Sequence, residues 1–157
     1  APSLAMDPYF FEGTAVEWAL CPLHVMEDII RAHGGPTQFT AHLDDFFANK
    51  LRKWKEILLH TPYLYHYAGR PDKTADEVRR QRRRYHTGRD GIPDNEDMGS
   101  NATFALATGI GLYPVMGEAR YWLNPPRFRE INLRVGMGDT RLHIRRCQYG
   151  NEDMIDR

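Results

Sequence analysis

The residues with the clearest chemical potential lie in one acidic segment, residues 90–99. It places four carboxylates within eight positions: Asp90, Asp94, Glu96 and Asp97. The segment stands directly before a predicted helix, and the positive end of a helix favours the ionised form of nearby carboxylates. Glu96 or Asp97 therefore suits a general base or a cation ligand better than a proton donor. Because Asp and Asn are also preferred helix caps, the pattern alone fits a solvated acidic loop equally well.

Other kinds of site receive less support from the sequence. The acidic segment lacks the ligand order and the glycine and glutamate positions of an EF-hand loop. The seven histidines include no pair spaced four residues apart with a glutamate beside it, as a zinc protease would need. There is no G-x-S-x-G motif and no phosphate-binding glycine loop. The sequence thus argues against acyl transfer and nucleotide chemistry.

The composition is that of one ordinary globular domain. The 157 residues are 41% hydrophobic and 27% charged, and 21 basic residues balance 21 acidic residues for a formal net charge of 0. This balance disfavours nucleic acid and anionic membranes as partners. Five arginines between Arg79 and Arg84 are therefore interpreted as a solvated or salt-bridged helix face. No segment approaches the roughly 18 apolar residues of a membrane span.

Three short features carry little functional information. Cys21 and Cys147 are too few for a disulfide framework, so we expect ordinary buried thiols. The chain opens with Ala1 rather than Met and has no leader-type segment, so we expect a start set by processing or truncation. A glycosylation sequon at residues 101–103 lies inside a predicted buried helix, which argues against its modification.

The elements that must position the acidic segment are mainly helical. Apolar spacing and stop signals predict helices from Leu23 to Gly34, from about Thr37 to about Leu58 with a break allowed, around Tyr63–Tyr67, from about Ala75 to about His86, and from Ser100 to Ile110. Thr74 and Glu77 have the form of a capping box for the fourth helix. Successive helical pairs with Gly-Pro stops are typical of an α/α toroid or solenoid.

The last part of the chain changes to a period of two. Ile131, Leu133 and Val135 alternate with polar neighbours, as do Leu142 and Ile144 after a turn. This pattern predicts a β-hairpin. We therefore expect a helical part over residues 1–114 and a β-hairpin closing segment over residues 115–157, packed on the same domain.

Several segments together resemble a known family. Residues 91–99 and 109–115 resemble the G-[LY]-P-G-N-[DE]-D-x-G…A-L-G-F-Y-P-V signature of glycoside hydrolase family 92, the calcium-dependent exo-acting α-mannosidases. Further similarities follow the family order at residues 11–15, 34–35, 43–47, 63–71 and 124–133. The resemblance spans about residues 10–155. It implies the C-terminal part of the catalytic region of a much longer protein.

The resemblance implies a mainly α fold: a partial (α/α)6 toroid followed by a short C-terminal antiparallel β segment. A partial toroid leaves apolar helix faces uncovered. We therefore expect a partner, either the missing N-terminal portion or another protein subunit. If the chain follows the family, it is secreted or periplasmic.

The resemblance also implies an activity, the inverting hydrolysis of terminal α-linked mannose from glycans. Such enzymes need one carboxylic acid and one carboxylate about 6.5 to 9.5 Å apart. Glu12 falls at the position of the general acid, and Asp97 matches the general base. The positions implied for substrate binding are His24, His60 and Glu96. The positions implied for calcium are Glu56 and Asn95.

Some positions depart from the family. Val16 stands at a usual Trp, Leu58-Leu59 at a usual Ser-His pair, and Ser100-Asn101 at a usual Gln-Met pair. Removing polar ligands from a sugar site leaves buried partners unpaired, at about 1–3 kcal/mol each. The alternative interpretation is therefore a catalytically inactive glycosidase-like subunit with a structural or interaction role in a larger assembly.

Overall fold

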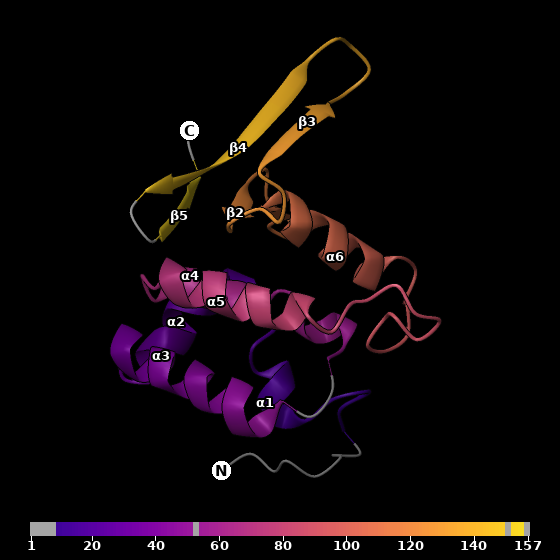
Figure 1. Cartoon of the computed structure of the whole chain (residues 1–157). Coiled ribbons are helices and arrows are strands. Elements are labelled where there is room, and N and C mark those ends of the chain that lie inside the picture. The colour runs from indigo at the N-terminus through magenta and orange to yellow at the C-terminus, as the bar shows by residue number, and fades with distance from the viewer. Residues whose placement is uncertain (1–8, 52–53, 150–151, 156–157) are drawn as a thin grey trace. The chain divides into compact units, whose positions relative to one another are not determined.

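A computed structural model describes residues 9–51, 54–149 and 152–155. The chain separates into two compact units, residues 1–101 and 102–157. The first unit is helical (Figure 1). Its elements are α1 (Ala15–Trp18), η1 (Leu23–Val25), α2 (Met26–Ala32), α3 (Pro36–Asp45), η2 (Phe46–Lys50), η3 (Glu56–Leu58), η4 (Thr61–Tyr63), α4 (Leu64–Tyr67) and α5 (Pro71–Arg82).

The junction between α2 and α3 follows from a Gly-Gly-Pro sequence. Gly34 and Gly35 adopt positive φ angles of 90° and 108°, which side-chain-bearing residues rarely adopt. Pro36 then opens α3, where its fixed φ suits the first helical turn. The predicted end of one helix and start of the next are therefore confirmed.

The amphipathic segment after Pro36 supplies the core of this unit. Phe39, Leu43 and Phe46 are fully buried, as the apolar spacing predicted. The helix does not continue to Leu58. It passes into the π-helical turn η2 and ends at Leu51, whose ψ of 106° is extended. Trp54 and Leu58 return to the core from outside the helix.

The fourth predicted helix starts earlier than expected. α5 begins at Pro71, so Thr74 lies inside the helix and makes no cap hydrogen bond. The predicted capping box of Thr74 and Glu77 is therefore wrong, and the helix ends at Arg82 rather than near His86. The physical reason is that Pro71 supplies a stronger first-turn residue three positions upstream.

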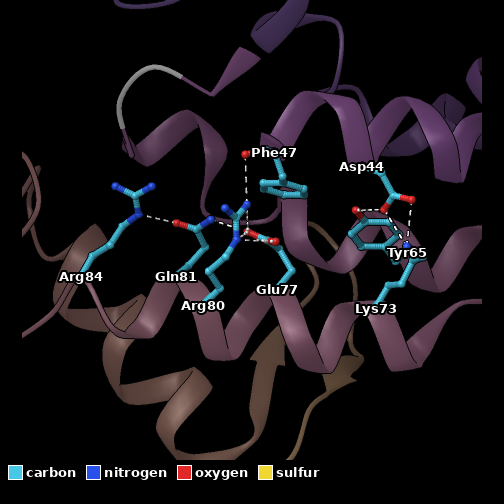
Figure 2. Close-up of polar contacts among 8 residues, drawn as sticks. All are labelled: Asp44, Phe47, Tyr65, Lys73, Glu77, Arg80, Gln81 and Arg84. Atoms are coloured by element: carbon cyan, nitrogen blue, oxygen red, sulfur yellow. Dashed lines mark hydrogen bonds and ion pairs between the residues drawn. The ribbon is translucent and has the colours of Figure 1, made fainter. Parts of the chain in front are cut away.

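Polar side chains join α5 to its neighbours (Figure 2). Lys73 and Tyr65 both donate hydrogen bonds to the Asp44 carboxylate, at 2.8 and 2.9 Å. Arg80 pairs with Glu77 at 2.9 Å and also donates to the Phe47 carbonyl at 3.1 Å. With Arg79 paired to Asp76, the salt-bridged character predicted for the arginine face is confirmed.

The second unit combines one helix with two small antiparallel sheets. Helix α6 (Ser100–Ile110) begins at the end of the first unit and has the bounds predicted from sequence. Strands β1 (Leu112–Pro114) and β2 (Tyr121–Leu123) form one sheet, and β3 (Glu130–Arg134), β4 (Arg141–Tyr149) and β5 (Glu152–Ile155) form the other.

The predicted hairpin is confirmed as β3–β4, with Ile131 opposite Ile144 and Leu133 opposite Leu142. The chain is thus helix-rich with small antiparallel sheets, as expected. The boundary between the units lies at Asn101, whereas the sequence placed the end of the helical part at residue 114, so most of α6 groups with the strands.

Two further expectations concern the surroundings of the chain. Within the described residues, no helix has the length and apolar character needed to cross a bilayer. Cys21 is half-buried, and burial, with the nearby charge of Glu17, raises the pKa of its thiol to about 11. A thiol with this pKa is largely protonated and unreactive at neutral pH. The side chain of Cys147 lies outside the described residues.

Candidate active site

Glu12 lies in a tight turn that precedes α1. Its backbone is left-handed, with φ 53°, which is uncommon for a residue other than glycine. Two local contacts hold the turn. The Trp18 indole N–H donates to the Phe11 carbonyl at 3.0 Å, and Thr14 and Glu17 form a capping box at the start of α1. The Glu12 side chain is half-buried.

A close backbone approach brings this turn against η3. At Gly13, a Cβ atom would lie 2.8 Å from Ile57 Cδ1 and 2.9 Å from Trp18 Nε1. Only glycine fits without displacing these atoms. Ile57 follows Glu56 in the chain, so the contact places the Glu12 turn beside the turn that carries Glu56.

Glu56 connects the two carboxylates predicted to be catalytic. Its pKa is raised, first by burial, and then by a hydrogen bond to Asp97 and by the negative charges of Asp97 and Glu12. Its own backbone N–H acts in the opposite direction. Since both neighbours influence it, Glu12 and Asp97 each lie near enough to Glu56 for their charges to act on it. Carboxyl groups gathered in this way favour a proton on one of them.

Asp97 opens a run of three left-handed residues. The φ angles are 47° at Asp97, 55° at Met98 and 92° at Gly99. The carbonyls before and within this turn are bound by the first residues of α6. Ser100 donates to the Asp97 carbonyl from its N–H at 3.2 Å and from its hydroxyl at 2.7 Å. Asn101 donates to the Glu96 carbonyl from its N–H at 3.4 Å and to the Asn95 carbonyl from Nδ2 at 2.6 Å.

A polar relay ties Asn101 to the segment before Glu56. The Trp54 indole N–H donates to the Tyr85 hydroxyl at 2.9 Å, and this hydroxyl donates to Asn101 Oδ1 at 2.6 Å. Trp54 is 1% exposed and Asn101 is fully buried. Burial, together with the negative charge of Glu96, raises the pKa of Tyr85 to about 12, so the hydroxyl keeps its proton for donation.

The start of the acidic segment is fixed by a second glycine. At Gly91 a Cβ atom would lie 1.9 Å from the His86 carbonyl oxygen. The Gly91 carbonyl in turn accepts the His86 N–H at 3.0 Å. No other residue fits here unless the backbone moves, so the segment leaves α5 along one path.

The other predicted site residues differ in their surroundings. His24 is exposed in η1. His60 is 5% exposed, and its Nε2–H donates to the Leu20 carbonyl at 3.0 Å. Burial lowers the pKa of His60, partly offset by this hydrogen bond. Asn95 is exposed and Glu96 half-buried. Sugar binding by His24, His60 and Glu96 remains a prediction, as do the roles of Glu12 and Asp97.

Three residues of the site escaped the sequence reasoning: Trp54, Tyr85 and Asn101. Trp54 was recognised only as part of an apolar face, and Tyr85 only as part of a predicted helix. Their hydrogen bonds join positions 31 and 16 residues apart. The departure of Ser100-Asn101 from the usual Gln-Met pair was the one available signal.

Carboxylate oxygens are the ligands that calcium prefers, so the donor chemistry around Glu56 suits the predicted ion. However, among the described residues, no three His, Cys, Asp or Glu side chains are arranged to hold a metal ion. The protein groups described here therefore do not form a complete calcium site, and no chemical step is assigned to calcium.

Comparison with known proteins identifies the class. The catalytic domain of glycosyl hydrolase family 92 matches residues 2–155, so the chain belongs to this family. It is 32% identical over 131 residues to an uncharacterized secreted glycosidase from Arthroderma benhamiae. The aligned region covers 82% of the chain and 17% of that protein. The structure resembles a family GH92 alpha-mannosidase from Bacteroides thetaiotaomicron, with a TM-score of 0.71 and 23% identity, covering 88% of the chain and 21% of that structure.

The chain thus spans about a fifth of the length of these relatives. Three positions where the chain departs from the pattern that the resemblance implies lie in the core. Val16, Leu58 and Leu59 are 6%, 0% and 5% exposed. Val16 lies in α1, which follows the turn that carries Glu12, and Leu58 lies in η3, which begins at Glu56. Leu59 follows η3 directly.

Proposed function

We propose that the chain forms the part of an inverting exo-α-mannosidase that carries both catalytic carboxylates. The observation that carries this proposal is the influence of Asp97 and Glu12 on the single carboxyl group of Glu56. The two residues are 85 positions apart, and nothing but the fold brings them together. Membership of family 92 supplies the substrate class, terminal α-linked mannose on glycans.

The proposed reaction assigns one role to each carboxyl group. Glu12 is protonated and gives its proton to the glycosidic oxygen as the bond to the anomeric carbon breaks. Asp97 removes a proton from a water molecule, whose oxygen bonds to the anomeric carbon from the opposite face. The product is mannose of inverted configuration, with Glu12 ionised and Asp97 protonated. His24, His60 and Glu96 are proposed to contact the sugar.

Hydrolysis of aryl α-mannosides by the full polypeptide tests these roles. We expect Glu12→Gln and Asp97→Asn each to lower kcat by roughly 10²- to 10⁴-fold. A dinitrophenyl leaving group needs no proton, so it should restore much of the rate of Glu12→Gln and none of that of Asp97→Asn. Glu27→Gln, an exposed change of the same type, is the control. Wild-type rates in Asp97→Asn would contradict the proposal.

Calcium is a second, separate proposal. Glu56 would supply a carboxylate and Asn95 an amide oxygen, and further ligands would come from outside the described residues. When bound, the ion acts as a Lewis acid and template for sugar hydroxyls. Removal of calcium with a chelator is expected to reduce activity, and added calcium to restore it. Chelator-resistant activity would remove calcium from the proposal and leave the carboxylate roles intact.

Leu58 and Leu59 are buried at positions where the resemblance implies polar residues, and this favours a second candidate function. In this alternative the chain is a catalytically inactive subunit that retains the helical scaffold. The helical pairs would then form part of an (α/α)6 toroid completed by the missing N-terminal portion or by another subunit. Secretion is proposed by analogy with the fungal relative. Absence of turnover on every α-mannoside by the full polypeptide would favour this alternative.

A further inference from the structure

We propose that Tyr85 and Asn101 are positioning residues that hold the Asp97 turn in its left-handed conformation. The inference rests on the proposed role of Asp97 for its catalytic meaning, but the structural claim stands independently. Neither residue touches the reacting atoms. Both act through the backbone that presents Asp97.

The turn needs external support because its conformation is costly. A left-handed backbone is unfavourable for residues that carry a Cβ, because the Cβ approaches the following carbonyl oxygen. Asp97 and Met98 adopt this unfavourable conformation in succession, and only Gly99, which has no Cβ, adopts it without strain. A strained run of this kind persists where surrounding contacts over-determine it. Met98 is fully exposed, so its side chain offers no packing in return.

The support comes from two adjacent residues that bind three consecutive carbonyls. Ser100 binds the carbonyl of Asp97, and Asn101 binds those of Glu96 and Asn95. The side-chain bond from Asn101 Nδ2 to Asn95 is 2.6 Å long and reaches back six residues. Asn101 therefore closes the whole turn rather than one end of it.

Tyr85 fixes the orientation of the Asn101 amide. Because the Tyr85 hydroxyl accepts the Trp54 indole N–H, its own proton points to Asn101 Oδ1. An amide whose oxygen accepts this proton must direct its NH₂ group to the Asn95 carbonyl. Each member of the relay thus determines the direction of the next, and the buried Trp54 anchors the end.

The resemblance implies a Met at position 101, and a Met there could form neither the amide bond to Asn95 nor the bond with Tyr85. The contact between Tyr85 and Asn101 therefore depends on the residue that stands at position 101 in this chain.

Substitution of Tyr85 in the full polypeptide tests the inference. We expect Tyr85→Phe to accelerate hydrogen–deuterium exchange of the backbone amides of residues 95–101 and to lower kcat on an aryl α-mannoside about tenfold, because small displacements of a catalytic group reduce rate steeply. KM should change less than kcat, since of the proposed sugar contacts only Glu96 lies in the loosened segment.

Tyr65→Phe is the matched control. It also removes a hydroxyl that donates to a side chain in the first unit, in this case to Asp44 at 2.9 Å. It should lower thermal stability while leaving kcat and exchange at residues 95–101 unchanged. If Tyr85→Phe does not fold, Asn101→Asp tests the same relay, because it keeps an oxygen to accept from Tyr85 but removes the Nδ2 donor to the Asn95 carbonyl.

Exchange and kinetics separate the two proposals. Unchanged exchange at residues 95–101 in a folded Tyr85→Phe protein overturns the inference. Faster exchange together with no mannosidase activity in the wild type supports the inference and rejects the proposed function. Faster exchange with unchanged kcat rejects the positioning role.

Discussion

The turns that present Glu12 and Asp97 share a left-handed backbone but are held by different means. The hydrogen bonds that hold the Glu12 turn are local: Trp18 donates to Phe11, seven residues earlier, and Thr14 pairs with Glu17, three residues later. The Asp97 turn depends on a relay that reaches Trp54, which is 31 residues from Tyr85. A local turn forms with its helix, whereas the distant one requires the unit to be folded.

This difference teaches where each carboxylate is vulnerable. Changes in the short stretch 11–18 should affect the Glu12 turn and the adjoining η3, and leave the Asp97 turn in place. Changes at several points spread along the chain should affect Asp97, because its turn collects contributions from separate segments.

The two glycines should give the largest effects, and unequal ones. Gly91→Ala drives a Cβ into the His86 backbone oxygen, 1.9 Å away, so we expect a loss of more than about 3 kcal/mol in the free energy of unfolding. Gly13→Ala meets the ends of the Ile57 and Trp18 side chains, which can shift, so we expect about 1–2 kcal/mol. Urea unfolding measures both changes. Equal losses would show that the two turns are equally constrained.

The capping residue of the local turn should give an intermediate effect. Thr14→Ala removes the hydroxyl that accepts the Glu17 N–H, so we expect the free energy of unfolding to fall by about 1 kcal/mol. Thermal unfolding measures this change. Thr14→Ser keeps the hydroxyl and should retain most of the stability. Exchange at residues 95–101 should not respond to either change. A response there would mean that the Asp97 turn depends on the Glu12 turn.

Relief of strain should give the smallest effect, and a favourable one. Met98 is exposed at φ 55°, and Asn tolerates this conformation better than Met. Met98→Asn should therefore stabilise the chain by about 0.5 kcal/mol. Met137→Asn changes an equally exposed residue whose φ is not positive, and it should have no effect. A loss of stability at Met98 would contradict the strain assigned to this turn.

The sequence predicted elements well where one local signal dominated. Helix α6 followed from its small apolar residues, and the β3–β4 hairpin followed from a clear period of two. The prediction of a capping box at Thr74–Glu77 was wrong because the spacing T-x-x-E does not by itself mark a helix start. The same spacing occurs at Thr14–Glu17. Only the first forms, since Pro71 starts the second helix before Thr74 is reached.

The candidate site was predictable only where its residues carried a local signal in the sequence. The acidic segment was visible from its composition, and family resemblance drew attention to Glu12 and Glu56. The relay through Tyr85 was not visible, because a tyrosine in a polar stretch carries no mark of a partner 16 or 31 residues away. Left-handed angles at Glu12 and Asp97 were also hidden, since neither residue type requires them.

The burial of Asn101 has a consequence for how the protein is best produced. Its side chain heads an Asn-Ala-Thr acceptor sequence, and oligosaccharyltransferase modifies such sites on nascent chains before they fold. A glycan attached there would occupy the nitrogen that donates to Asn95 and could not be accommodated inside the folded unit. In a eukaryotic secretory host, the yield of folded protein would then depend on whether the chain folds before the glycan is transferred. Expression in a bacterial cytoplasm avoids this competition.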